Sequence, residues 1–417
     1  MLTGLEVRGV EAFNHTSIPL HIFGPPQFFS YWFDPKGLVR ILMNRRLAVT
    51  SLAVLMMVGL AACSNGTPPE ATTATASAPS SGGGMTGTVW VANEEGDSLT
   101  VLDAATNEVV TTLTGVESPH NVQAGADGSV GYAVSGHDNT TIAVDAESYQ
   151  VAAVAPSGPA PAHVIDAADG TKVYTTNAGD GTVSVYRAPG FDPVATIDLG
   201  GMPHGLRPAA DGSVIAVANT EAGSVDLIDP GTDTKTASVP VEGGPVQVAV
   251  DADGTYAYAS IAEPASVVKI DLAAREVVGT VEVSASPVQV YLSPDGRTLL
   301  SADQGTEAEP GNTLSVIDPI GMTARGSVRT GSGPHGVVID TTGTRAWVTN
   351  TYDDTVSVVD LESLSVLATV PVGDLPNGIS FSSRPPGDVE EPSIRLEIPE
   401  PSRAATGEAE QTEGHAH

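Results

Sequence analysis

Short hydrophobic runs, separated by polar and turn-forming residues, return in the same order every 42 residues along most of this chain. A proline marks the same point in each copy, and the gaps between successive prolines are 42, 42, 42, 42, 47 and 42 residues. Regular periods of about 20 to 50 residues are typical of repeat architectures. The chain therefore contains seven copies of one unit, from Val89 to about Ser383. The seven prolines are Pro119, Pro161, Pro203, Pro245, Pro287, Pro334 and Pro376.

Each copy contains four short runs that are rich in Val, Thr and Ile and alternate between apolar and polar positions. This alternation predicts β-strands. The first two runs flank a turn dipeptide, which is Asp-Gly in five copies, as at Asp127-Gly128, and Thr342-Gly343 in the sixth. Asp-Gly is a strong signal for a tight hairpin. The unit is therefore predicted to be a four-stranded antiparallel meander.

A four-stranded sheet of this size cannot bury both of its faces alone. Sheets arranged around an axis cover one another's faces, which is the β-propeller solution. The array begins at a second strand, at Val89, and stops just after a first strand, Asn377 to Phe381. We therefore predict an all-β fold over residues 87–383, a seven-bladed β-propeller of four-stranded antiparallel blades. Pairing of the N- and C-terminal strands in one shared blade closes the ring.

Residues 43–62 have the pattern of a secretory signal peptide. Met43 is followed by Asn44 and two arginines, then by an apolar stretch from Leu47 to Leu60 and a small-residue site that ends at Cys63. An uncleaved membrane helix is the alternative, but about 14 apolar residues are few for a membrane span. The Leu-Ala-Ala-Cys ending resembles a bacterial lipoprotein box. That resemblance implies lipidation of Cys63, the only cysteine, and attachment to the extracytoplasmic side of the cell membrane.

Three further segments flank the repeats. Residues 1–42 show no usable period and would place the signal inside the chain, so we expect translation to start at Met43. Residues 63–86 begin with the lipidated cysteine and continue as a Ser/Thr/Pro/Ala-rich linker, which is predicted to be disordered. Residues 384–417 form a Pro- and Glu-rich tail that is also predicted to be disordered. We expect the protein to act as a monomer.

The chain carries 18 basic and 50 acidic residues, a formal net charge of −32 at pH 7. Nucleic-acid binding normally needs a basic surface, so this charge disfavours a nucleic-acid partner. The sequence has neither a G-x-S-x-G elbow nor a glycine-rich phosphate loop. We therefore favour a protein without catalytic activity.

Strand direction places the residues after each proline, and the loops between second and third strands, on one rim of the ring. Those loops add acidic residues such as Glu94. His120, His163 and His204 come from three consecutive repeats and could converge, whereas His335 is set apart from them. Histidine and carboxylate together suit a divalent metal, although each imidazole could instead bond only a backbone carbonyl. The candidate ligand or metal residues of this rim are His120, His163, His204, His335, Asn121, Gln247, Gln289 and Asn377.

The fifth gap is 47 residues because five extra residues enter one of the loops on this rim, Gln304 to Asn312. A lengthened loop on an otherwise uniform scaffold is a common place for function. We therefore predict a partner-binding loop with Asp303, Glu307 and Glu309.

The repeats resemble the YVTN (YncE-like) family of bacterial β-propellers over the whole array. The likeness is carried by Val348-Thr349-Asn350, by the run Thr355 to Asp360 and by Val370-Pro371-Val372-Gly373. The family includes surface proteins, proteins implicated in nucleic-acid binding and domains attached to oxidoreductases. The resemblance therefore implies the fold and no single activity.

One repeat, from Ala162-His163 to Tyr186, also looks like the corresponding repeat of seven-bladed lactonases, which open sugar lactones. It lacks the denser histidine pairing of that family. We therefore expect a membrane-anchored lipoprotein whose propeller is a non-catalytic scaffold for a protein or small ligand. A lactonase-like hydrolase and a metal-binding propeller are the alternatives.

Overall fold

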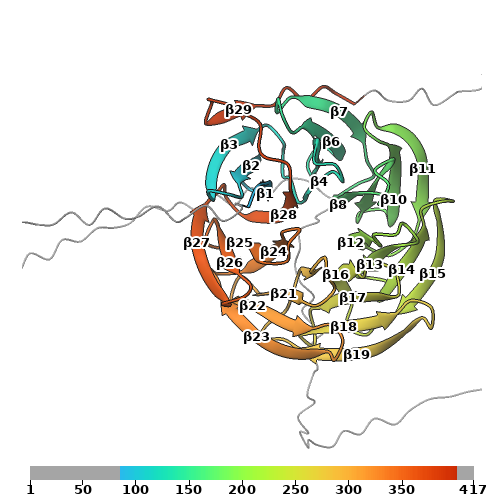
Figure 1. The fold of residues 1–417 in the computed structure, drawn as a ribbon. Coiled ribbons are helices and arrows are strands. Elements are labelled where there is room, and N and C mark those ends of the chain that lie inside the picture. Colours follow the sequence, from blue (N-terminus) through green and yellow to red (C-terminus); the bar gives the residue numbers. More distant parts are fainter. Residues whose placement is uncertain (1–84, 402–417) are drawn as a thin grey trace, which may run out of the picture. The chain divides into compact units, whose positions relative to one another are not determined.

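Seven sheets surround a central channel in the computed structural model, which describes residues 85–401 (Figure 1). Six sheets have four strands and one has five, and every pairing within the repeats is antiparallel. The predicted fold class, an all-β seven-bladed propeller, is therefore confirmed. No helix among residues 85–401 has the length and apolar character of a membrane span. The predicted signal and Cys63 lie outside the described residues.

Each blade runs from an innermost strand beside the channel to an outer strand at the circumference. The innermost strands are β4 (Val122–Ala124), β8 (Pro161–Asp166), β12 (Pro203–Pro208), β16 (Pro245–Val250), β20 (Val290–Leu292), β24 (Pro334–Ile339) and β28 (Pro376–Ser382). The second strands are β1 (Thr88–Asn93), β5 (Val130–Ser135), β9 (Lys172–Asn177), β13 (Ile215–Asn219), β17 (Tyr256–Ile261), β21 (Leu299–Gly305) and β25 (Arg345–Asn350).

The two remaining strands of each blade complete the sheet outward. The third strands are β2 (Ser98–Asp103), β6 (Thr140–Asp145), β10 (Thr182–Arg187), β14 (Ser224–Asp229), β18 (Ser266–Asp271), β22 (Pro310–Asp318) and β26 (Thr355–Asp360). The outer strands are β3 (Glu108–Thr114), β7 (Val151–Pro156), β11 (Asp192–Asp198), β15 (Thr234–Pro240), β19 (Glu276–Glu282), β23 (Thr323–Arg329) and β27 (Ser365–Pro371).

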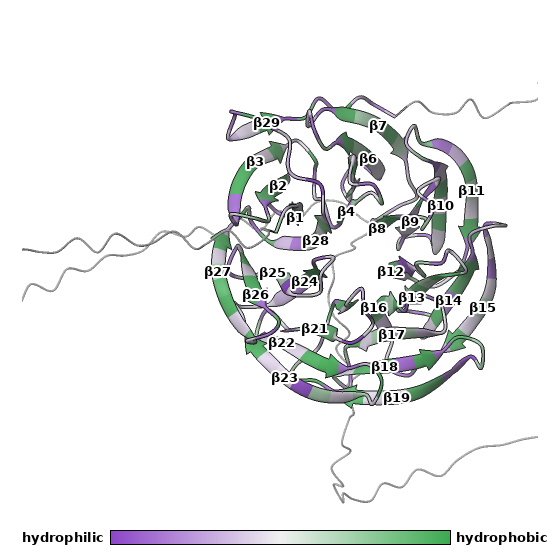
Figure 2. Ribbon diagram, in the orientation of Figure 1, coloured by the Kyte–Doolittle hydropathy of each residue, from purple (hydrophilic) through white to green (hydrophobic). Residues whose placement is uncertain are grey.

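The hydrophobic core lies between neighbouring blades. The second and third strands are almost wholly buried, whereas outer strands such as β19 expose most of their residues. Figure 2 accordingly shows hydrophilic and hydrophobic residues interspersed along the outer strands. Large side chains fill the gaps between blades, as where the ring of Trp90 meets that of Tyr149 at a centroid distance of 5.8 Å. Each sheet thus depends on its neighbours to exclude water.

The two ends of the repeat array share one blade. Strand β28, from the end of the array, pairs antiparallel with β1, from its beginning, and Phe381 lies opposite Val89. This is the predicted closure of the ring.

The segment that follows β28 differs from the expectation of disorder. The short strand β29 (Ser393–Arg395) pairs in parallel with the outer strand β3 and makes a fifth strand in the closing blade. The side chain of Leu396 is 4% exposed and packs in the core beside Leu113. The prediction of disorder therefore does not hold for residues 384–401, because apolar side chains of this segment pack against the outer edge of the closing blade.

A β-bulge interrupts most of the innermost strands near their first residues. In β12 the register shifts between Pro203 and Leu206, and β8, β16 and β24 shift at the equivalent position. Residues three apart in a regular strand point to opposite faces, and a bulge reverses this relationship. His204 and Arg207, which are three apart in β12, can therefore both face the channel.

Candidate metal centre

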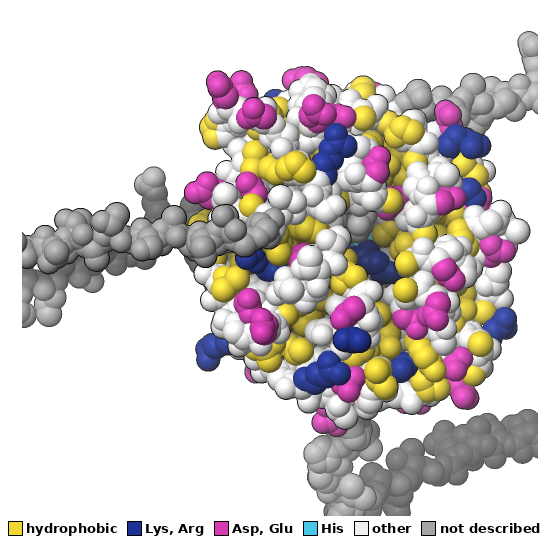
Figure 3. All heavy atoms as spheres, in the orientation of Figure 1, with side chains coloured by type: hydrophobic (Ala, Val, Ile, Leu, Met, Phe, Trp, Pro, Cys, Tyr) yellow, Lys and Arg dark blue, Asp and Glu magenta, His cyan; other side chains and the backbone are white. Residues whose placement is uncertain are grey.

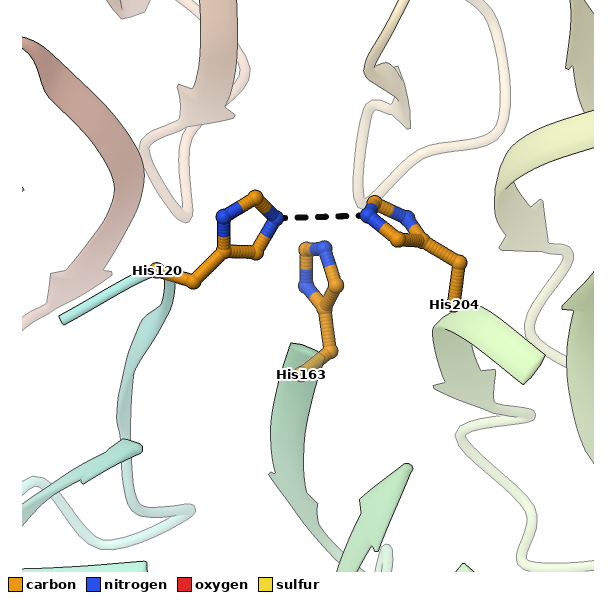
Figure 4. Close-up of side chains that lie close together, drawn as sticks. All are labelled: His120, His163 and His204. Carbon is orange, nitrogen blue, oxygen red and sulfur yellow. Dashed lines mark hydrogen bonds between the residues drawn. The ribbon is translucent and has the colours of Figure 1, made fainter. Parts of the chain in front are cut away.

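Four histidines from four blades meet in the central channel, and Figure 4 shows three of them. The ring centroid of His120 lies 5.5 Å from that of His163, 5.2 Å from that of His204 and 6.2 Å from that of His335. The rings of His163 and His204 are 4.8 Å apart. The metal-binding atoms of His120, His163 and His204 all lie within 4.8 Å of one another. The cluster is thus compact enough to enclose one ion.

His335 belongs to this cluster, although its position in the sequence set it apart. The innermost strands of a closed ring all face one axis, so separation along the chain does not separate their side chains across a narrow channel. His335 is 6% exposed, and Gln304 Nε2 lies 3.0 Å from its Nδ1 atom. Its ring centroid lies 6.2 Å from that of His120, and it is not among the three histidines whose ligand atoms lie within 4.8 Å of one another. His335 therefore borders the three-histidine group.

Hydrogen bonds orient two of the imidazoles toward one point. His120 Nδ1 lies 3.2 Å from a carboxylate oxygen of Glu94, and His204 Nδ1 lies 3.0 Å from the backbone oxygen of Val246. An ionised carboxylate and a carbonyl only accept hydrogen bonds, so both Nδ1 atoms carry a hydrogen and a neutral ring keeps its lone pair on Nε2. A histidine whose other nitrogen donates to a carboxylate or a carbonyl is the usual form of a metal ligand.

The two Nε2 atoms of His120 and His204 lie 3.2 Å apart, as the dashed line in Figure 4 shows. Zinc–nitrogen bonds of about 2.0 to 2.1 Å in a tetrahedral site place two ligand nitrogens about 3.3 Å apart. The observed separation therefore matches a pair of ligands on one ion. Without an ion, a second proton on one of the two rings would be needed to bridge these lone pairs.

Two glutamines support the other imidazoles. Gln247 Nε2 lies 3.4 Å from His163 Nδ1, and Gln304 is placed in the same way against His335. The Gln247 oxygen accepts a hydrogen bond of 3.0 Å from the backbone N–H of Val248, so its Nε2 faces His163 as a donor. The Gln304 amide can present either its oxygen or its nitrogen to His335 after a half-turn. Gly205 makes this arrangement possible, because a Cβ atom there would collide with the Gln247 amide.

The electrostatics favour neutral imidazoles at most of these positions. Burial, and then the neighbouring His120, lowers the pKa of His204 to about 3 and that of His335 to about 3. Burial also lowers the pKa of His163 well below its usual range. Metal binding requires the neutral ring, so these three side chains are already in the ligand form at neutral pH.

His120 and Glu94 form the charged part of the centre. Burial would lower the pKa of His120, but the attraction of Glu94 and its hydrogen bond outweigh that effect and raise it. Burial would raise the pKa of Glu94, but His120 and the Asn377 amide lower it to about 2. Asn377 donates to Glu94 through Nδ2, while its buried Oδ1 has no hydrogen-bond partner among residues 85–401. The carboxylate thus stays ionised beside the candidate ion.

Other residues of the predicted rim have structural roles. Asn121 accepts a hydrogen bond from the backbone N–H of Val164, and Gln289 donates to the backbone oxygen of Val337, so both connect neighbouring blades.

The predicted partner loop is only partly a loop. Asp303 is fully buried and accepts hydrogen bonds from three serines, Ser284, Ser301 and Ser315, so it is a structural residue rather than an exposed one. The extra residues instead lengthen the β21–β22 hairpin. Only Glu307 and Glu309 of the three predicted acidic residues are exposed.

The sequence placed Glu94 and Gln304 in loops of this rim but included neither among the candidate ligand or metal residues. Glu94 follows β1 as one of many acidic loop residues, and Gln304 lies in the lengthened hairpin. Only the closed ring shows that Glu94, at the start of the array, contacts Asn377 near its end.

A family model described as a YNCE-like beta-propeller matches residues 125–297. These repeats are therefore similar to the YncE-like family. No curated protein matches the chain significantly. The YncE-like match covers the repeats that contribute His163 and His204, whereas His120 and His335 lie outside it.

Solved structures from several bacteria share the fold. A hydrazine synthase chain of Kuenenia stuttgartiensis is 21% identical with a TM-score of 0.58, and the match covers 64% of this chain and 90% of that one. A functionally unknown protein of Desulfotomaculum acetoxidans is 16% identical with a TM-score of 0.61, over 72% of this chain and 99% of that one. A candidate 6-phosphogluconolactonase of Bacteroides fragilis is 17% identical with a TM-score of 0.59, over 72% and 98%. At these identities the likeness shows the fold alone.

Proposed function

We propose that this protein is an exported, lipid-anchored propeller that binds a divalent transition-metal ion through the histidines of its central channel. The anchor would be Cys63, after cleavage of the signal at residues 43–62, and the propeller would lie on the extracytoplasmic side of the membrane. The observation that carries the metal assignment is the 3.2 Å separation of two Nε2 atoms whose rings are both oriented through Nδ1.

The donor set favours zinc or copper(II) over magnesium or calcium. Imidazole nitrogen suits zinc, copper and nickel, whereas magnesium and calcium prefer oxygen ligands. The ligands would be His120, His163 and His204, whose ligand atoms lie within 4.8 Å of one another. The proposal is therefore a metal-binding site.

Zinc titration of the purified full chain tests the metal site. After dialysis against a chelator, calorimetric titration with zinc should give one tight site in the native protein. His204→Ala should weaken that site at least about 100-fold, since loss of a direct ligand should exceed the usual effect of losing a supporting residue. The matched control is His137→Ala, which disrupts the exposed group of Glu117, His137 and Asp138, a second set of side chains within metal-binding distance. Equal zinc affinity in native protein and His204→Ala would contradict the proposal.

The anchor has a separate test. Cells grown with a labelled fatty acid should incorporate the label into the native protein and not into Cys63→Ala, which should also leave the membrane fraction. Labelling of Cys63→Ala at the native level would show that lipid is attached elsewhere or that the signal is misidentified.

A further inference from the structure

The central channel contains a cavity of about 350 Å³ at the end away from the histidine rim. All seven blades contribute to its wall the residue that lies four positions after the repeat proline. Four of these residues are polar, namely Gln123, Arg207, Tyr291 and Ser380. Figure 3 shows the hollow at the centre of the ring with basic side-chain atoms inside it.

Arg207 is the only lysine or arginine that lines this cavity. Its Nη1 donates one hydrogen bond, 3.1 Å long, to the backbone oxygen of Leu206. None of the ion pairs among residues 85–401 includes Arg207. Arg207 is partly buried, and a guanidinium group has five N–H donors. Most of the donors of this cation are therefore available to a ligand.

The nearest acidic side chain of the cavity does not neutralise Arg207 by direct contact. Asp166 is 8% exposed and accepts a hydrogen bond of 2.5 Å from the backbone N–H of Ala126. Burial, only partly offset by this bond, raises the pKa of Asp166 to about 6. Below about pH 6 the Asp166 carboxyl is therefore mostly protonated, and Arg207 makes the cavity positive in a protein whose net charge is −32.

The remaining wall is largely apolar. Ile165, Val250, Leu292, Val338 and Ile379 line it together with several alanines. The volume is that of roughly a dozen water molecules, since each occupies about 30 Å³ of the liquid. The space therefore suits a small molecule with an apolar body and one anionic group.

We propose that this cavity binds a small organic carboxylate, with the carboxylate on the guanidinium of Arg207 and the apolar body against the aliphatic wall. Arginine and carboxylate form paired, charge-assisted hydrogen bonds, which gives both affinity and orientation. The bulge in β12 allows the same strand to present His204 to the metal centre and Arg207 to this cavity, about 10 Å further along. The carboxylate site is thus distinct from the metal centre, although the charge of Arg207 is among the influences that lower the pKa of His163.

A fluorinated probe tests the proposal directly. Fluorine NMR of 4-fluorobenzoate should show saturable line broadening with the full chain. The expected Kd is near or below about 1 mM, because a ligand small enough for this cavity makes few contacts. Arg207→Gln should weaken binding at least about tenfold, as expected for loss of a hydrogen bond to a charged group. Arg207→Lys, which keeps the charge, should lose less. Asp166→Asn should tighten binding severalfold at pH 8, since it removes the carboxylate that faces the bound anion.

Competition and neutral probes separate the ligand classes. Unlabelled benzoate should displace the probe, whereas benzyl alcohol and inorganic phosphate should not at tenfold higher concentration. Displacement by phosphate as effective as that by benzoate would overturn the assignment to organic carboxylates. Unchanged probe affinity in Arg207→Gln, with a native melting temperature, would overturn the role of the guanidinium. Absence of saturable binding up to about 10 mM probe would overturn the site altogether.

Discussion

His120 and His204 face one another across the channel with their Nε2 atoms 3.2 Å apart, although 84 positions separate them in the chain. The Nδ1 atom of each ring lies against a hydrogen-bond acceptor, which is Glu94 for His120 and the backbone oxygen of Val246 for His204. Two lone pairs so directed repel one another unless a proton or a metal ion lies between them. The pKa of His120 is raised by Glu94, so a metal ion at this contact competes with a proton on His120.

Zinc should raise the melting temperature of the full chain. An ion at about 100 times its Kd adds about 2.7 kcal/mol to stability, which corresponds to a shift on the order of 5 °C for a domain of this size. Differential scanning fluorimetry with and without zinc measures the shift. His204→Ala should abolish it and His137→Ala should preserve it. A shift that survives in His204→Ala would place the ion elsewhere.

Glu94→Gln should weaken zinc binding by about 10- to 100-fold, because partners that orient a ligating histidine typically contribute this much. Glutamine preserves the size of the side chain and an acceptor oxygen but removes the charge that favours His120 as a donor. Glu95→Gln is the matched control, because Glu95 is the exposed neighbour in the same loop. Competition with a chromophoric chelator gives both affinities. Equal losses in the two variants would indicate only the loss of a surface charge.

Stability should fall as pH rises from about 4 to about 6, through the contribution of Asp166. Its pKa in the folded state is about 6, and an unfolded aspartate has a pKa of about 3.9. The folded state therefore binds more protons in this window, and its advantage shrinks by at most about 3 kcal/mol on deprotonation. Arg207, Asp127 and Tyr132 are the charged and titratable groups coupled to Asp166.

Urea unfolding between pH 4 and pH 7 tests this contribution by difference. Asp166→Asn keeps an acceptor for the Ala126 N–H but cannot ionise, so its stability relative to native protein should rise across the window. Asp253→Asn, at an exposed turn, should show no such trend. A constant difference between native protein and Asp166→Asn would mean that Asp166 titrates normally.

Leu396→Ala should destabilise the propeller by about 2 to 4 kcal/mol, since a buried leucine is replaced by a smaller side chain. Leu396 anchors the segment that adds β29 to the closing blade, and its backbone N–H donates to Thr114 at 2.8 Å. Glu397→Ala, at an exposed position, is the control. Guanidinium unfolding gives the free energies. A change within about 0.5 kcal/mol for Leu396→Ala would mean that the segment does not stabilise the fold.

The blades and their closure could be predicted because they depend on period and on strand order. The 42-residue repeat set the number of sheets, and the offset between Val89 and Pro376 implied a shared blade. The strands of a blade lie within one repeat of the sequence, and the number of blades follows from the number of repeats. The strand at Ser393–Arg395 could not be predicted, because it forms only where an outer edge is already present.

The composition of the channel could be predicted less well. His120 and His204 lie one residue after their prolines and His163 lies two after, so regular alternation would place them on different faces. Bulges in β8 and β12 bring His163 and His204 to the same side, and no residue pattern in the repeat indicates these bulges. Likewise, the acidic side chain of Asp303 belongs to a network of buried serines rather than to the exposed loop that its position in the sequence suggested.

The irregular start of the innermost strands has an evolutionary consequence. Each repeat presents side chains to the channel at two heights, yet the packing between sheets depends on other positions of the same repeat. Single substitutions at either level of the channel can therefore change what binds there while the scaffold stays intact. Duplication or exchange of a whole repeat would change the side chains at both levels together.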